Sequence, residues 1–258
     1  MDVPAPRGVR DLDGVNEAGA RGRAVDGGHS HPDVTGGWLR PAVFGAMDGL
    51  VSNFALVAGV AGGVASAGGG TSAVVLAGMA GLAAGAFSMA AGEYTSVASQ
   101  AELARGELAV ERLALARTPE LEQEELAQRY VERGVEVGVA REVARQLSRD
   151  PDQALAVHAR DELGVDPGDL PSPLLAAVAS FLAFTAGALL PVLPYLLGAT
   201  SLLPALVVSG VGLFGAGALV SLVTVNPWWW TGSRQLLLGA AAAGLTYWVG
   251  MLVGSGIV

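Results

Sequence analysis

Three side chains that could hold a cation lie in stretches with almost no other charge. Asp48 and Glu93 are the only charged residues between Pro41 and Ala98, and Met89 precedes Glu93 by four residues. A carboxylate at membrane depth costs roughly 2.5 kcal/mol or more, so it usually faces a partner, a cavity or an ion. Met89 and Glu93 share one helix face and offer a soft and a hard ligand to a divalent metal. The pattern indicates an ion path.

Each of these residues also has a structural interpretation. Asp48 could pair with Arg40 or cap a helix end. Methionine packs more often than it binds metal, and Glu93 near the end of its helix could reach out to water. Only the combination of Asp48, Met89 and Glu93 favours the ion path.

A second group of possible ligands lies in residues 99–172, which hold sixteen acidic residues and nine arginines. Three pairs are spaced three or four residues apart, so each pair lies on one helix face. These pairs are Glu107 and Glu111, Glu122 and Glu125, and His158 and Glu162. The two Glu pairs bring like charges together, which destabilises a helix, and their repetition suggests that a cation shares the site. By spacing alone, a solvated acidic face is the alternative.

The composition indicates an integral membrane protein. The chain has 258 residues, is 52% hydrophobic and only 15% charged, and has a mean hydropathy of +0.48. From Pro173 to Val258 the only charged residue is Arg234. The absence of cysteine excludes disulfides and thiolate zinc sites, and a net charge of -9 argues against a nucleic-acid partner.

Motifs of common enzymes are missing, so we expect no enzymatic activity. Residues 210–215 match the glycine pattern of dinucleotide sites, but they lie inside an apolar run, where glycines serve helix packing. No Walker loop, HExxH motif or convincing Ser/His/Asp arrangement is present.

The hydrophobic runs predict an all-α membrane protein in which an acidic helical insert separates the second span from the third. Predicted spans cover about 41–65, 72–98, 173–197, 201–224 and 234–256. The second span is expected to continue into the insert as a helix to about Ala116. The next helix is expected to begin with Thr118 as its N-cap and to end at Gly134, and the last helix of the insert to begin at Asp150 and end at Gly164. The domains are then a disordered tail (1–37), two spans (38–98), the insert (99–172) and three spans (173–258).

Arginine distribution sets the expected topology. The nine arginines of the insert predict that it is cytoplasmic, which places the N-terminus in the cytoplasm and the C-terminus outside. His29 and His31 in the tail are expected to be solvated. No organelle signal was recognised, which makes a prokaryotic cell membrane the simplest location.

Several blocks resemble the vacuolar iron transporter family over about residues 38–256. They are FGAMDGLVSN (44–53), AGAFSMAAGEY (84–94), Ser99-Gln100, Pro119–Glu122 and Gly187–Pro191. The resemblance implies a homodimer with its pathway at the interface, lined by Asp48, Met89 and Glu93. It also implies export of Fe²⁺ or Mn²⁺ from the cytosol against protons.

The resemblance further implies that the insert is a cytoplasmic metal-binding domain. Its implied ligands are Glu111, Glu122, Glu125 and Glu162, with Glu107 nearby. The chain departs from the family pattern at Ala114, where a second Glu is common, and at His158-Ala159, where some members have two methionines. His158 could replace a methionine ligand, since imidazole also suits iron.

The sequence therefore predicts a divalent metal/proton antiporter. Two alternatives are a membrane-anchored ferroxidase and a metal-sensing protein. A di-iron enzyme would favour Glu-x-x-His pairs on two helices, which the insert lacks. A sensor would leave Asp48 and Glu93 unexplained.

Overall fold

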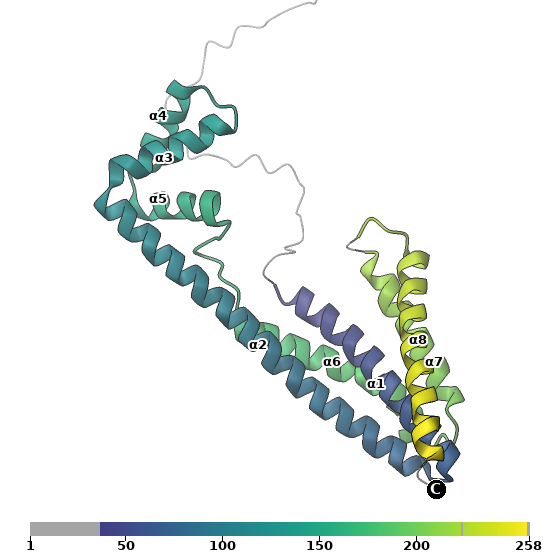
Figure 1. Cartoon of the computed structure of the whole chain (residues 1–258). Coiled ribbons are helices and arrows are strands. Elements are labelled where there is room, and N and C mark those ends of the chain that lie inside the picture. The colour runs from purple at the N-terminus through teal and green to yellow at the C-terminus, as the bar shows by residue number, and fades with distance from the viewer. Residues whose placement is uncertain (1–36, 223, 257–258) are drawn as a thin grey trace, which may run out of the picture. The chain divides into compact units, whose positions relative to one another are not determined.

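The computed structural model describes residues 37–222 and 224–256, and all regular elements in these residues are helical (Figure 1). The elements are α1 (Leu39–Ala67), α2 (Thr71–Arg117), α3 (Pro119–Glu132), α4 (Val137–Leu147), α5 (Pro151–His158), the π-helical turn η1 (Ala159–Leu163), α6 (Pro173–Leu196), α7 (Leu203–Val220) and α8 (Trp228–Ser255). The predictions for the tail, including His29 and His31, fall outside the described residues.

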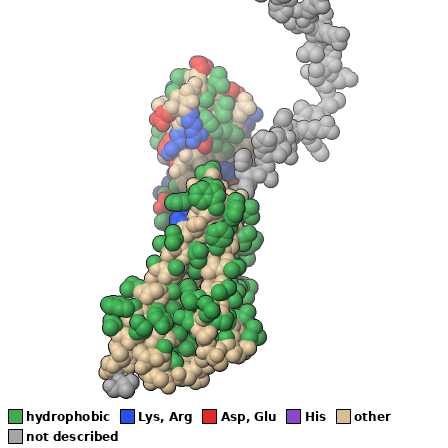
Figure 2. All heavy atoms as spheres, turned by 90° about the vertical axis from the view of Figure 1, so that its right-hand side faces the viewer, with side chains coloured by type: hydrophobic (Ala, Val, Ile, Leu, Met, Phe, Trp, Pro, Cys, Tyr) green, Lys and Arg blue, Asp and Glu red, His purple; other side chains and the backbone are tan. Residues whose placement is uncertain are grey.

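Five of these helices, α1, α2, α6, α7 and α8, are long and apolar enough to cross a membrane. This confirms the predicted fold class and number of spans. Large hydrophobic side chains are exposed on all five helices, including Leu76, Leu182, Val211 and Leu245. On the face drawn in Figure 2, hydrophobic side chains cover much of the larger part of the molecule, whereas most charged side chains gather at one end. Such a surface suits contact with lipid.

Helix α1 is the centre of the packing among the spans, because it contacts α2, α6, α7 and α8. Leu50 and Phe54 of α1 pack with Leu213 of α7, and Val57 packs with Val192 of α6. The helices α1 and α6 approach closely because glycines face the partner backbone. A Cβ on Gly49 would strike the carbonyl group of Phe184, and one on Gly187 would strike that of Ala46.

Helix α2 is a single element of 47 residues that begins as a span and continues into the insert (Figure 1). This confirms the predicted continuation of the second span. Two small cores hold the insert. One packs the insert on the polar half of α2 and contains Leu108 of α2 and Leu155 of α5. The other joins the insert helices to one another and contains Leu126 of α3 and Ala144 of α4.

The helix ends match the sequence signals except at two places. Gly134 and Gly164 adopt φ values of 95° and 65°, and Asp150 caps α5 by accepting from the backbone N–H groups of Asp152 and Gln153. Thr118 stands at the start of α3 but does not cap it, because its hydroxyl donates to the carbonyl of Ala114 at 3.1 Å. The last span begins at Trp228 instead of about 234, so the three tryptophans 228–230 form its first turn.

Candidate functional site

A polar pocket of about 400 Å³ is bordered by α1, α2 and α6. Asp48, Met89 and Glu93, the three side chains singled out in the sequence, all line it. The remaining lining residues are small or apolar apart from three hydroxyl groups: Ser52, Gly85, Ser88, Gly92, Ser96 and Phe184. A carboxylate pair, a thioether and three hydroxyl groups form a plausible set of cation ligands.

The packing of α1 places Asp48 in this pocket. Gly45 and Gly49 are one turn apart on α1, and both face α6 at close range. Residues advance by about 100° around a helix, so Asp48 and Ser52 lie to one side of this glycine face. The hydroxyl of Ser52 donates to the backbone oxygen of Asp48 at 2.6 Å, and its oxygen lone pairs stay available to the pocket.

Asp48 does not use Arg40 as a partner. Within residues 37–222 and 224–256, its carboxylate makes no ion pair. The guanidinium of Arg40 lies 5.7 Å from the centre of the Phe44 ring instead. The alternative interpretation of Asp48 as the partner of Arg40 is therefore wrong.

Glu93 also lines a second, much smaller pocket of about 30 Å³. Arg40, Gln100 and Ser172 are among the polar residues around that pocket. Gln100 lies two turns further along α2 towards the insert, and Ser172 caps the start of α6. Glu93 therefore lies between the pocket among the spans and the side from which the insert begins.

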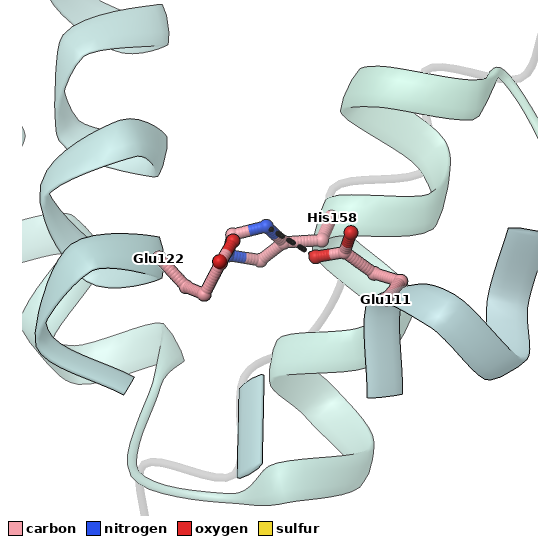
Figure 3. Close-up of side chains that lie close together, drawn as sticks. All are labelled: Glu111, Glu122 and His158. Atoms are coloured by element: carbon pink, nitrogen blue, oxygen red, sulfur yellow. Dashed lines mark ion pairs between the residues drawn. The ribbon is translucent and has the colours of Figure 1, made fainter. Parts of the chain in front are cut away.

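A second group of ligands meets inside the insert. Glu111 of α2, Glu122 of α3 and His158 of α5 each offer a ligand atom within 4.8 Å of the others. Figure 3 shows the imidazole of His158 between the two carboxylates. The separation is about twice a metal–ligand bond of roughly 2.0–2.3 Å, so one divalent ion could contact all three.

The surroundings of His158 favour a metal-binding tautomer. Its side chain is fully buried, and Nδ1 hydrogen-bonds Glu162 Oε1 at 3.1 Å. A neutral imidazole that donates from Nδ1 carries its lone pair on Nε2. Within the described part of the chain, Nε2 is buried without a hydrogen-bond partner. An unpaired buried acceptor is costly, which a cation at Nε2 would relieve.

Glu111 is a second buried acceptor without a partner. Its Oε1 lies 3.0 Å from His158 Nδ1 but makes no hydrogen bond with any described residue. Burial raises the pKa of the Glu111 carboxyl, and the negative charges of Glu162, Glu122 and Glu125 raise it further against the lowering effect of His158. The site therefore concentrates negative charge, which the opposing effect of His158 offsets only in part.

This raised pKa predicts how stability depends on pH without metal. Between the ordinary carboxyl value of 4.5 and the raised value, the folded chain binds more protons than the unfolded chain, so stability falls as pH rises through this window. Replacing Glu111 by Gln should therefore raise the unfolding temperature of chelator-treated protein at neutral pH. The gain should disappear as the pH approaches 4.5. Thermal unfolding of Glu111→Gln, measured from neutral pH down to pH 4.5, checks this prediction, with the exposed Glu107→Gln as the control. The same gain in unfolding temperature at every pH would contradict it.

Two further predicted ligands, Glu125 and Glu162, already face a cation. Arg129 of α3 lies 3.1 Å from Glu125 Oε1 through Nη2 and 3.1 Å from Glu162 Oε1 through Nε. Burial alone would lower the pKa of Arg129, but the contacts with Glu162 and Glu125 outweigh it and raise that pKa. Arg129 was not among the residues predicted from the sequence, although its spacing of four from Glu125 was a signal. Glu107 is exposed, one turn before Glu111, and lies outside the group of three.

The fold and these two sites define an integral membrane protein of several spans that carries possible cation ligands both among its spans and in an acidic helical insert. The model of the VIT family matches residues 39–251. The chain belongs to this family.

Similar proteins are named as iron transporters. A vacuolar iron transporter of Acanthamoeba castellanii is 37% identical over 241 residues, which cover 89% of this chain and 84% of the relative. Vacuolar iron transporter 1 of Oryza sativa subsp. japonica is 30% identical, with 85% of this chain and 88% of the relative covered. A vacuolar iron transporter of Toxoplasma gondii is 30% identical over 98% of this chain and 84% of its own length. The family and the names of these relatives support metal transport as the activity.

Proposed function

We propose that this protein exports Fe²⁺, and also Mn²⁺, from the cytosol by exchange for protons. The observation that carries the proposal is the pocket among the spans, where Asp48, Met89 and Glu93 come together from α1 and α2. Carboxylates at membrane depth without a basic partner are expected at an ion path. The names of the relatives support iron as the cargo.

The insert is proposed to collect the metal. Glu111, Glu122 and His158 supply a first set of donors, and the charge of the surrounding carboxylates raises the local concentration of cations. Glu107, Glu125 and Glu162 are proposed as further ligands. The continuous helix α2 connects the insert with Glu93, from which the ion would pass to Met89 and Asp48.

Exchange with protons follows from the ligand chemistry. Carboxylates must lose their protons to bind a metal, and they take protons up again when the metal leaves. If Asp48 and Glu93 bind metal from the cytosolic side and protons from the other side, the two flows are coupled. This requires access to the pocket from each side in turn.

A second copy of the chain is proposed to complete the path. Asp48 and Ser52 are exposed on the isolated chain, and a charged group at membrane depth does not normally face lipid. A homodimer that covers this face of α1 and α2 would enclose the pocket. We also propose that the chain is divided into the domains expected from the sequence, which are residues 1–37, 38–98, 99–172 and 173–258.

The orientation and the location are also proposals. The insert and the N-terminus are placed in the cytoplasm because of the arginines in the insert. The relatives are named as vacuolar proteins and come from eukaryotes, and a prokaryotic cell membrane stays a prediction from the sequence.

The test is metal flux in proteoliposomes under anoxic conditions. We expect the purified full chain to move Fe²⁺ into vesicles when a pH gradient is imposed, and to move protons in the opposite direction. Collapse of the gradient should stop accumulation of the metal. Absence of flux from a chain that still binds Fe²⁺ would reject the transporter and favour the sensor; oxygen-dependent oxidation of Fe²⁺ by the same chain would favour the ferroxidase.

A further inference from the structure

The guanidinium of Arg129 contacts two of the carboxylates that we propose as metal ligands of the insert. It bridges Glu125 on its own helix and Glu162 on η1, with both nitrogen–oxygen distances at 3.1 Å. Glu162 Oε1 also accepts from His158 Nδ1. Arg129 thus touches two carboxylates that border the group of Glu111, Glu122 and His158.

We propose that Arg129 is a built-in competitor of the metal, which holds Glu125 and Glu162 until the arriving cation displaces it. The inference rests on the proposed metal-collecting role of the insert. It divides the donors into two classes. Glu111, Glu122 and His158 receive the ion first, and Glu125 and Glu162 join only after Arg129 has left.

The contacts of Arg129 suit such an exchange. Its side chain is 33% exposed, and that of Glu125 is 51% exposed. Ion pairs that water reaches are weak, so Arg129 can swing into solvent at low cost. Glu162 is only 13% exposed and keeps its hydrogen bond to His158 Nδ1. The inner carboxylate therefore stays in place while the arginine moves.

The competition would also match the needs of transport. A collecting site must release its ion to the next site, so binding that is too tight blocks passage. An arginine that returns to Glu125 and Glu162 would help to expel the metal towards Glu93. It would also limit the repulsion between the carboxylates when no metal is bound.

Arg133 provides a matched control. It lies four residues further on, at the C-terminal cap of α3, and also forms an ion pair with η1, with 2.8 Å between Nη1 and Asp161 Oδ1. Its partner Asp161 is not among the proposed ligands. Arg133→Gln therefore removes the same charge and an ion pair between the same two elements, without freeing a ligand.

The experiment compares Fe²⁺ affinities of the full chain in detergent, measured by anoxic calorimetry. We expect Arg129→Gln to tighten binding by about tenfold, equivalent to about 1.4 kcal/mol, and Arg133→Gln to leave the affinity within about twofold of the native chain. Arg129→Lys, which keeps the charge but not the bridge between two carboxylates, should fall between these variants. Helical content measured by circular dichroism verifies that each variant is folded.

A double substitution tests whether the gain comes from the freed ligands. In a chain that already carries Glu125→Gln, the gain from Arg129→Gln should shrink, because one of the two freed carboxylates is gone. Equal affinities of Arg129→Gln and Arg133→Gln, with Fe²⁺ still bound by the native chain, would overturn the competition and leave the collecting site intact. If neither the native chain nor Arg129→Gln binds Fe²⁺ in the insert, both proposals fail.

Discussion

Replacement of Asp48 by Asn should abolish metal flux while leaving the fold intact. The two side chains have nearly the same shape, but Asn carries no charge to stabilise a divalent ion or to exchange a proton. We expect the initial rate of Fe²⁺ uptake into proteoliposomes to fall about 100-fold or more, which corresponds to roughly 2.7 kcal/mol of lost stabilisation. Gradient-driven uptake, measured side by side for the two proteins, checks this prediction.

The control for Asp48→Asn is Glu102→Gln, which removes an exposed carboxylate of α2 that lies outside the pocket. Its flux should match that of the native chain. Calorimetry should also show that Asp48→Asn binds Fe²⁺ in the insert as the native chain does, because Asp48 belongs to the separate pocket of α1 and α2. Unchanged flux would keep the transporter but remove Asp48 from its path.

Loss of the imidazole at position 158 should strongly weaken metal binding by the insert. His158 is fully buried, its Nδ1 lies 3.0 Å from Glu111 Oε1 and 3.1 Å from Glu162 Oε1, and its Nε2 has no partner among the described residues. We expect His158→Leu to weaken Fe²⁺ affinity by about 100-fold or more, because loss of a residue that only supports a ligand already costs roughly 10- to 100-fold. Calorimetry on the full chain measures this loss.

A second variant separates the missing ligand from the missing packing. Leu and Met fill similar volumes, but only Met offers a sulfur to a metal. His158→Met should therefore recover part of the affinity that His158→Leu loses, although both remove the hydrogen bond to Glu162. Equal, weakened affinities of the two variants would show that a sulfur at position 158 does not act as a ligand, and native affinity in both would show that this position contributes by packing alone.

Much of the architecture is written in local signals. Runs of apolar residues longer than a bilayer requires predict the five spans, because lipid excludes most charged side chains and demands internally bonded helices. The mix of Ala, Leu, Glu and Arg predicts the helical insert, and Gly134, Gly164 and Asp150 mark its helix ends. Met89 and Glu93 fall on one face because they are one turn apart.

Two helix starts differ from the prediction because the local pattern permits more than one conformation. The last span begins at Trp228 because aromatic residues can form a helix turn at an interface as well as a loop, and composition does not decide between them. The hydroxyl of Thr118 donates to the carbonyl of Ala114 instead of capping α3. A threonine hydroxyl can either donate to a carbonyl of the preceding turn or accept from an N–H of the following helix, and the sequence does not decide between them.

The sequence by itself determined a five-span helical protein with an acidic insert, and it named the side chains able to bind a cation, because hydropathy and helical period are local properties. Only the tertiary structure decided which of these meet. Asp48 joins Glu93 because the glycines of α1 pack against α6. His158 reaches Glu111 and Glu122, and Arg129 reaches Glu162, because the insert helices fold back on α2. Those encounters join residues far apart in the chain, and no local pattern encodes such a distance.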